Sequence, residues 1–208
     1  MIKSERLNTI IEMVDHCDSF YDLCCDHGMI GLGVYQRDKT KHLYLNDQVK
    51  SICDKLKYKI ESIYSYIPSQ ISLINKPCET IKFVNNSTIC IAGVGYDTII
   101  RILENVPKDA QLIISSHTKQ QKLRHHLISR FKLLEERLVY EGGRFYEILK
   151  LNSYEGEVLS LLGNFPIDSN FKAYLEQIHR FHATKLRYGN DSFSKEILKY
   201  IVDKQKEF

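Results

Sequence analysis

The order of hydrophobic and polar residues predicts short strands that alternate with helices over the first three quarters of the chain. Runs rich in apolar and β-branched residues predict five strands, SFYDL (19–23), HLYLND (42–47), ISLIN (71–75), TICIA (88–92) and QLIIS (111–115). Helical periodicity marks residues 4–16 with Ser4 as N-cap, 52–63 with Pro68 as the stop, 99–103, and a basic helix at 118–130. Such alternation is typical of βαβ units and predicts a doubly wound α/β domain with a mainly parallel sheet.

The rest of the chain follows a different pattern. Two β-rich segments flank Gly142-Gly143, which predicts a hairpin at one sheet edge. A turn-rich stretch at 153–169 precedes a predicted helical hairpin, with Ser192 capping its second helix. Its predicted inward positions are Phe171, Tyr174, Leu175, Ile178, Phe181, Leu186, Phe193, Ile197, Leu198 and Ile201. We expect a main domain at 1–152 and a C-terminal extension at 153–208. Because two helices alone cannot form a core, the extension must dock on the main domain or on a partner.

Charge changes the picture only once it is divided along the chain. The net charge of +3 over 208 residues selects no partner. Residues 1–116 carry 13 basic and 14 acidic side chains, whereas residues 117–150 carry 8 and 4, and residues 171–208 carry 8 and 5. The asymmetry hints at a polyanionic partner, although ordinary solvated helix faces would explain it equally well.

The cysteines and the apolar segments address the compartment. All six cysteines lie within residues 17–90, and none forms a CxxC pair, so their spacing indicates neither a zinc site nor a disulfide framework. No segment has the length or apolar character of a signal peptide core or a membrane span. We therefore expect a cytoplasmic protein with reduced thiols, no membrane association and no metal.

Residues that follow the predicted strands are the candidates for chemistry, because ligands of open α/β sheets bind at the carboxyl ends of the strands. They comprise Asp22, Cys24, Cys25, Asp26, His27, Gly28, Asn46, Asp47, Pro77, Cys78, Glu79, Gly93, Val94, Gly95, Ser115, Ser116 and His117. Asp47 lies about 20 residues beyond the first strand end, where an acid can accept hydrogen bonds from ribose hydroxyls. Each has a structural alternative, such as a helix cap for Asp22 or close packing for Gly93. The sequence lacks GxGxxG, P-loop, HExxH and GxSxG motifs.

Several segments together resemble the bacterial tRNA (adenine(22)-N1)-methyltransferase family. DLCCDHGMIG (22–31) resembles its D-x-G-[ST]-D-H motif, and GRFYEIL (143–149) resembles its G-[KR]-x-Y-E strand. Further similar segments are SERL (4–7), ICIAGVGYDTIIRIL (89–103), LIISSH (112–117) and GNFP (163–166). The resemblance covers nearly all of residues 3–188. The chain departs from the family at four places. Cys24 replaces the motif glycine, and Tyr96 replaces the second glycine of the GG pair. Pro77 or Cys78 stands where the family has an acid, and Ser116-His117 replace Pro-Asn.

The resemblance implies a Rossmann-like class I methyltransferase sheet with helices on both faces and a C-terminal helical hairpin. It further implies S-adenosylmethionine as methyl donor and a folded tRNA as partner, with the protein a monomer or weak homodimer. The implied cofactor-binding residues are Asp22, Cys24, Asp26, His27, Asp47, Cys78, Glu79, Gly93, Val94 and Gly95. Asp26 and His117 are the implied catalytic residues. The implied tRNA-binding residues are Arg6, Lys119, Lys122, Arg124, Arg130, Arg144, Lys172, Arg180, Lys185 and Arg187.

Two alternatives remain open at this level. One is a methyltransferase of the same fold that acts on another RNA or on a small molecule. The other is a protein that has lost catalysis and binds RNA or protein, with Cys24 and Pro77 marking an altered pocket.

Overall fold

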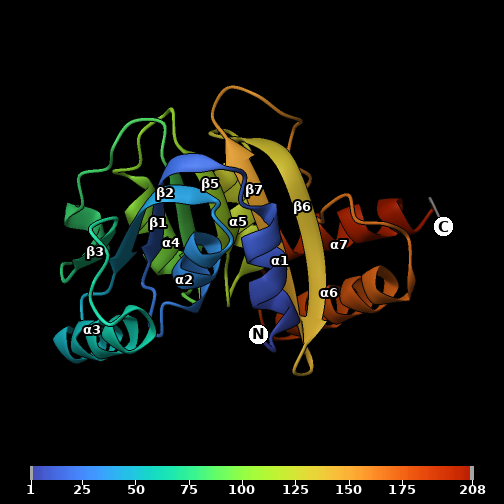
Figure 1. Ribbon diagram of the computed structural model, residues 1–208. Coiled ribbons are helices and arrows are strands. Elements are labelled where there is room, and N and C mark those ends of the chain that lie inside the picture. Colours follow the sequence, from blue (N-terminus) through green and yellow to red (C-terminus); the bar gives the residue numbers. More distant parts are fainter. Residues whose placement is uncertain (1, 207–208) are drawn as a thin grey trace.

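A computed structural model describes residues 2–206; residues 1, 207 and 208, which the expected domain limits include, lie outside the described residues. Within that range the strands form one seven-stranded sheet in the order β3-β2-β1-β4-β5-β7-β6 (Figure 1). The strands are β1 (Cys17–Leu23), β2 (Thr40–Asn46), β3 (Ile71–Ile74), β4 (Thr88–Ala92), β5 (Gln111–Ser115), β6 (Lys132–Glu141) and β7 (Arg144–Asn152). The first five are parallel, and β7 and β6 are added antiparallel beyond β5, which confirms the predicted α/β class.

Helices cover both faces of this sheet (Figure 1). They are α1 (Glu5–Met13), α2 (Met29–Gln36), α3 (Lys50–Tyr64), α4 (Tyr96–Leu103), α5 (Gln120–Leu127), α6 (Ser169–Tyr188) and α7 (Ser192–Gln205), with the 3-10 turn η1 (Cys78–Thr80). Successive strand residues point to opposite faces. Phe20 therefore packs with α1 to α3, whereas Tyr21 packs with α4 and α5. No helix within residues 2–206 combines the length and apolar character that a bilayer crossing requires.

Most of the predicted elements are confirmed, and the exceptions have local causes. Ser4 caps α1 by accepting from the Leu7 amide, and Gly142-Gly143 turn the β6–β7 hairpin with positive φ angles of 59° and 79°. Helix α3 ends at Tyr64 rather than at Pro68, because Ser65 takes a left-handed conformation. The basic helix is shorter than predicted and spans Gln120–Leu127.

Helix α2 is missing from the sequence prediction. It is almost wholly buried, so its apolar residues form no amphipathic stripe. A Cβ atom at Gly31 would lie 2.5 Å from Leu45, and one at Gly33 would lie 2.5 Å from Ile11. These two glycines let the helix approach β2 and α1 closely.

The C-terminal helices pack on the hairpin end of the sheet. Phe171, Ile178 and Ile197 form a core with Phe165 and with Phe145 of β7. Of the two expected docking sites of this hairpin, the main domain or a partner, the structure shows the main domain.

Two details of this helical hairpin were predicted wrongly. Phe181 is 58% exposed rather than inward, because the buried stripe of α6 continues from Ile178 to His182, which is 3% exposed. Asp191, not Ser192, is the N-cap of α7, and its carboxylate accepts a hydrogen bond from the Ser194 hydroxyl at 2.5 Å.

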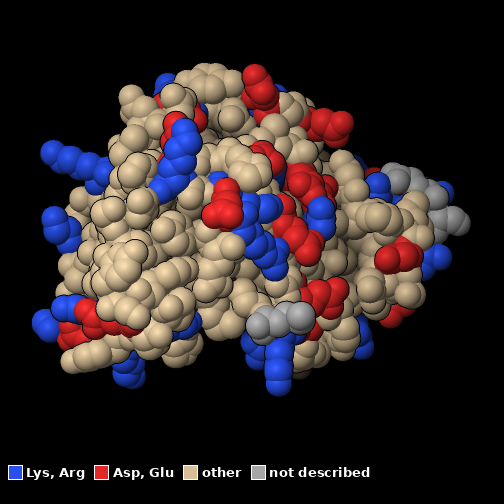
Figure 2. Space-filling view, in the orientation of Figure 1, with Lys and Arg blue, Asp and Glu red and all other residues tan. Residues whose placement is uncertain are grey.

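Charges on the face that carries α1 and β6 are of both signs and interspersed (Figure 2). Arg137 of β6 lies 3.5 Å from Glu12 of α1 and 2.8 Å from its strand neighbour Glu135. The excess positive charge of the sequence is therefore not gathered on this face.

Candidate functional site

The loops after β1, β2, β3, β4 and β5 meet at one edge of the sheet because these strands are parallel. Strand order reverses between β1 and β4, which are neighbours in the sheet although two strands separate them in sequence. A crevice for ligands forms at such a switch point in open α/β sheets. The predicted strand-end residues therefore gather at this edge, as their sequence positions indicated.

Asp47 is a buried acid at this edge. It follows β2 and is 7% exposed, and its two carboxylate oxygens accept backbone N–H groups. Val49 N donates to Oδ1 at 2.9 Å, and Asp26 N donates to Oδ2 at 3.3 Å. Since each carboxylate oxygen can accept more than one hydrogen bond, Asp47 holds the loop after β1 and keeps capacity for a ligand.

The loop after β1 has glycine-like backbone without glycine. Cys24 and Asp26 have φ angles of 52° and 45°, a left-handed conformation that costs energy in non-glycine residues. Cys24 Sγ lies 3.2 Å from Cys78 Sγ, and the Cys78 thiol also donates to Asn46 Oδ1 at 2.8 Å. Cys24 thus adopts a left-handed backbone conformation that favours glycine, while its sulfur lies against Cys78 in the 3-10 turn η1 after β3.

Asp22 is buried and bonds to the backbone of α2. It is 2% exposed, and its Oδ2 accepts the Gly31 amide of α2 at 2.8 Å. Burial raises the pKa of this carboxyl to about 7, although the hydrogen bond from Gly31 opposes the shift. In the structure, Asp22 therefore fixes the turn between β1 and α2.

His27 and Glu79 lie at the outer rim of the edge. The His27 side chain is 72% exposed, and its Nε2 lies 3.4 Å from Asp26 Oδ2. Glu79 pairs with Arg101 of α4 at 3.1 Å. Hydrogen bonds, first from its own amide and then from Arg101, lower the Glu79 pKa.

On the other side of the switch point, two hydrogen bonds join the segments after β4 and β5. His117 N donates to Val94 O at 3.0 Å, and Tyr96 N donates to Thr118 Oγ1 at 3.2 Å. Gly93 has a φ of 82°, and a Cβ atom there would meet nothing within 4 Å. The loop therefore presents bare backbone to open space, which leaves room for a ligand to approach. Gly95 is the N-cap of α4.

His117 belongs to a cluster that sequence reasoning did not assemble. Its Nε2 lies 2.8 Å from Arg6 Nη1, and its ring contacts the edge of the Tyr146 ring. The Arg6 guanidinium in turn stacks over Tyr146, 4.8 Å from the ring centre. Partial burial, together with the nearby Arg6 and Arg144 charges, lowers the pKa of His117. Because Arg6 can only donate, His117 Nε2 is the acceptor of this hydrogen bond and carries no proton in this arrangement.

A groove of about 500 Å³ opens beside His117, between the start of α5, β7, α6 and α7. Its cationic lining residues are Lys119, Lys122, Arg144 and Lys185, and its aromatic ones are Phe145, Tyr174, Phe181 and Phe193. Lys119 is also paired with Asp97 at 2.8 Å, and Lys185 lies 3.4 Å from Asp191. Four of the ten predicted tRNA-binding residues thus share one groove that begins at the strand ends.

The other predicted cations lie elsewhere. Arg130, at the far end of α5 from the groove, donates to Leu103 O at 3.0 Å. Arg6 contacts His117 rather than the groove. The remaining three, Lys172, Arg180 and Arg187, are exposed residues of α6 outside the groove lining.

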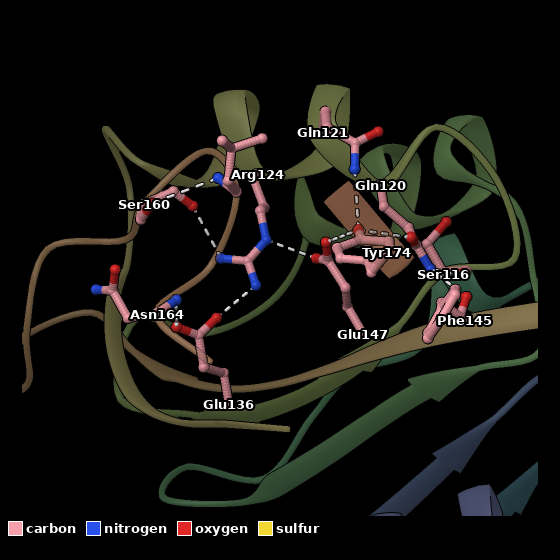
Figure 3. A network of polar contacts seen from close by, with 11 residues as sticks. Ser116, Gln120, Gln121, Arg124, Glu136, Phe145, Glu147, Ser160, Asn164 and Tyr174 are labelled. Atoms are coloured by element: carbon pink, nitrogen blue, oxygen red, sulfur yellow. Dashed lines mark hydrogen bonds and ion pairs between the residues drawn. The ribbon is translucent and has the colours of Figure 1, made fainter. Parts of the chain in front are cut away.

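Arg124 corrects the tRNA-binding prediction. The Arg124 side chain is 0% exposed and lies between the carboxylates of Glu136 and Glu147 (Figure 3). Its Nε lies 2.5 Å from Glu147 Oε2. Burial alone would lower the pKa of this guanidinium, but the two carboxylates raise it above its ordinary value. Since no phosphate can reach it, Arg124 is a structural residue.

The same network reaches α6 (Figure 3). The Tyr174 hydroxyl donates to Glu147 and accepts from Gln121 Nε2 at 2.9 Å, and Arg124 Nη1 donates to Ser160 O at 2.9 Å. Glu136 also accepts the Asn164 amide at 2.6 Å. The network therefore joins the sheet, α5 and the C-terminal extension below the groove.

A comparison with protein families matches residues 3–149 to the methyltransferase domain family. The chain belongs to this methyltransferase family. The match covers the sheet and the helices α1 to α5, and it includes the strand-end loops described above. None of the curated proteins matches the sequence of this methyltransferase.

Solved structures extend the likeness beyond the methyltransferase domain. M. capricolum TrmK in complex with S-adenosyl-homocysteine has a TM-score of 0.82 at 24% identity, over 100% of this chain and 98% of that one. The B. subtilis M1A22 tRNA methyltransferase TrmK has a TM-score of 0.69 at 21% identity, over 99% and 96%. The ribosomal protein L11 methylase of Lactobacillus delbrueckii subsp. bulgaricus reaches 0.55 at 13% identity, over 72% and 77%. At these identities the likeness shows the fold, which for the two TrmK proteins includes the C-terminal helices.

The methyltransferase brings some predicted site residues together and separates others. Cys24, Asp26, Asp47 and Cys78 form one connected group through the contacts above. Asp26 and His117, both predicted to be catalytic, share no hydrogen bond or ion pair within residues 2–206, and β4 lies between their strands. Sequence reasoning missed Tyr146 as a site residue, although GRFYEIL contains it within the quoted motif.

Proposed function

We propose that this methyltransferase transfers a methyl group from S-adenosylmethionine to N1 of an adenine in tRNA, at position 22. Full-length likeness to two TrmK proteins supports this proposal, since one is named for M1A22 tRNA methylation and the other was solved with S-adenosyl-homocysteine. The observation that carries it is the groove lined by Lys119, Lys122, Arg144 and Lys185, which starts at His117.

The strand-end residues fit an adenosine-type cofactor. Asp47 offers a buried carboxylate whose remaining acceptor capacity suits ribose hydroxyls. The open space above Gly93 suits a group that lies against the backbone. Cys24 has the left-handed backbone that the corresponding glycine would adopt, so the loop shape does not depend on glycine. We assign cofactor contact to Asp47, to the loop of Cys24 to His27, and to Gly93 to Gly95.

When bound, S-adenosylmethionine supplies a methyl group that is already activated on a sulfonium. The protein therefore mainly has to align the acceptor nitrogen, a contribution worth roughly 7–11 kcal/mol in favourable intramolecular cases. Because adenine N1 lies on the Watson–Crick edge, the base has to be unpaired when it reaches the site. We assign the positioning of this base to the cluster of Arg6, His117 and Tyr146, whose rings and guanidinium offer stacking and hydrogen-bonding surfaces.

The groove supplies the nucleic-acid contacts. Aromatic side chains beside lysine and arginine are the combination that binds unstacked bases and phosphates. We assign phosphate contact to Lys119, Lys122, Arg144 and Lys185, with Lys172, Arg180 and Arg187 extending the cationic surface along α6. A division at residue 152, a cytoplasmic location, and a monomeric or weakly dimeric state without metal complete the proposal.

The experiment that tests the function uses the purified chain, S-adenosylmethionine with a labelled methyl group, and an unmodified tRNA transcript. We expect label in the RNA and a primer-extension stop at adenine-22, because an N1-methyl group blocks pairing. A matched transcript with guanine at position 22 is the control. Equal label in both transcripts would contradict the position, and label in neither, with turnover of a small acceptor, would contradict the RNA.

Asp47→Ala tests the cofactor site independently of the tRNA-binding groove. We expect it to weaken S-adenosylmethionine binding measured by calorimetry, because the ribose acceptor is lost, and to leave tRNA binding measured by gel shift intact. If Asp47→Ala and wild type bind the cofactor equally, the assignment of Asp47 is wrong.

A further inference from the structure

Cys24 and Cys78 are far apart in sequence and adjacent in space. Cys24 follows β1 and Cys78 lies in η1 after β3, and 54 positions separate them. Strand β2 lies between β1 and β3, so the pair spans the carboxyl end of β2. Their sulfurs are 3.2 Å apart, whereas a disulfide bond needs about 2.05 Å. An approach of about 1 Å by two loop residues would bring them to bonding distance.

The surroundings of the pair favour this approach over any other cysteine pairing. All six thiols are free; within the pair, Cys24 is half-buried and Cys78 is 6% exposed. Two of the other thiols contact backbone carbonyls rather than sulfur, Cys53 Sγ at Asp47 O and Cys17 Sγ at Lys39 O. The vicinal Cys25 is half-buried, and its backbone amide bonds to Asn46 O at 2.9 Å. Among the described residues, the pair of Cys24 and Cys78 is the one with sulfurs in contact.

The hydrogen bond between the two thiols also divides their roles. It is the largest cause of the lowered pKa of Cys78 and of the raised pKa of Cys24. Cys78 is therefore the sulfur that ionises more readily, and thiolates are the nucleophiles of thiol oxidation.

We propose that Cys24 and Cys78 are an oxidisable pair that forms an intramolecular disulfide across the end of β2 and weakens cofactor binding. With a peroxide as oxidant, the Cys78 thiolate attacks one oxygen, the O–O bond breaks, and a sulfenic acid and one water result once the displaced hydroxide takes up a proton. The Cys24 sulfur then attacks the sulfenic sulfur, the S–S bond forms, and a second water leaves with the thiol proton. Two thiols lose two electrons in total, and the peroxide is reduced to two waters.

The consequence for the cofactor rests on the proposed function. Oxidation moves Cys24 toward the β3 loop, and Cys24 is followed by Asp26, whose amide bonds to Asp47 at 3.3 Å. The bond from the Cys78 thiol to Asn46, 2.8 Å long, is lost at the same time. Because both changes disturb the end of β2 beside Asp47, we expect the oxidised protein to bind S-adenosylmethionine at least fivefold more weakly.

Thiol mapping tests the pair directly. The full chain is treated with hydrogen peroxide at a low molar excess, alkylated, digested and analysed by mass spectrometry, with reduction by dithiothreitol as the reversal. We expect a peptide pair linked through Cys24 and Cys78 in the wild type and in the control Cys25→Ser, and no such link in Cys24→Ser or Cys78→Ser. Six alkylated thiols after oxidation, or a link from Cys24 to Cys25 or to a second chain, would overturn the proposal.

Calorimetry with S-adenosylmethionine on the reduced and oxidised forms then separates the two hypotheses. A mapped disulfide together with weakened binding supports the whole proposal, and equal affinity of both forms overturns its regulatory part. A reduced protein that binds no cofactor contradicts the proposed function, whereas the mapped link still decides the oxidisable pair.

Discussion

The junction beneath the groove and the loops at the strand ends both bury polar side chains, but they stabilise them in different ways. At the junction, Arg124 lies between Glu136 and Glu147, and Tyr174 adds a hydrogen bond from α6. At the strand ends, Asp47 and Asp22 accept backbone amides, and neither has an ion-pair partner among residues 2–206. The junction therefore satisfies its charges within the protein, whereas the strand ends keep acceptor capacity and strained backbone that a ligand can use.

This difference suggests a division of labour. The paired charges of the junction fix the C-terminal extension against the sheet, so the lysines of α5 and α6 face each other across one groove. The Asp22 carboxyl, whose pKa is raised by burial, remains sensitive to pH, and Asp47 keeps acceptor capacity for a ligand that binds beside it. Substitutions in the two regions should consequently differ in their readout, as the following predictions state.

Replacement of Arg124 should have the largest effect on stability. Arg124→Met leaves two buried carboxylates without a cation, and breaking a buried ion pair in this way costs roughly 3–5 kcal/mol. Urea denaturation should show that loss. The control is Arg137→Met. The Arg137 side chain is 45% exposed and contacts Glu12 and Glu135, so its replacement should cost less than about 1 kcal/mol. Equal costs for the two variants would contradict a structural role for Arg124.

Asp22 should make stability depend on pH. Its pKa in the folded protein is raised to about 7 by burial, above the ordinary value of 3.8. The group therefore contributes stability that is fully present below pH 4 and is lost as the pH rises through 7. Between pH 5 and pH 8 we expect wild type to lose roughly 2–4 kcal/mol relative to Asp22→Asn, which cannot ionise.

Urea midpoints at pH 5, 6.5 and 8 measure this difference. Asp18→Asn is the matched control, because Asp18 lies on the same strand and its side chain is 76% exposed. Wild-type and Asp22→Asn curves that run parallel over this range would show that Asp22 is already ionised in the folded protein.

The sequence predicts the sheet well because its strands are short buried runs bounded by turn residues. Helix α2 could not be predicted in this way, because it is buried on nearly all sides and shows no amphipathic stripe. Its Gly31 and Gly33 are also residue types that are typical of loops. Their positions after the predicted strands located Asp47, Gly93 and His117 at one edge, because parallel strands bring successive loops together.

Contacts between distant segments could not be predicted in the same way. Arg124 looks like an exposed residue of a basic helix, and only the position of the β6–β7 hairpin shows that Glu136 and Glu147 surround it. Arg6 and Tyr146 lie 140 positions apart and meet only because α1 packs beside β6 and β7. The proximity of Cys24 and Cys78 likewise depends on the order of the strands.

The smallest of these effects concerns the hydrogen bond that α6 adds to the junction. Tyr174→Phe keeps the ring in the core of the extension but removes the hydroxyl that bonds Glu147 and Gln121. Gln121 Nε2 then loses this partner while Glu147 keeps Arg124, and leaving a buried polar group unsatisfied costs about 1–3 kcal/mol, less than removing the Arg124 charge. Urea denaturation measures the cost, and Tyr188→Phe, with Tyr188 89% exposed, is the control.

Hydrogen exchange distinguishes a local from a global effect of the same variant. If the hydroxyl fastens the extension to the sheet, amides of α6 should exchange faster in Tyr174→Phe while those of β1 and β4 stay protected. Uniformly faster exchange would mean that sheet and extension unfold as one unit. The junction would then stabilise the strand-end loops as well, and the two regions would not be energetically separate.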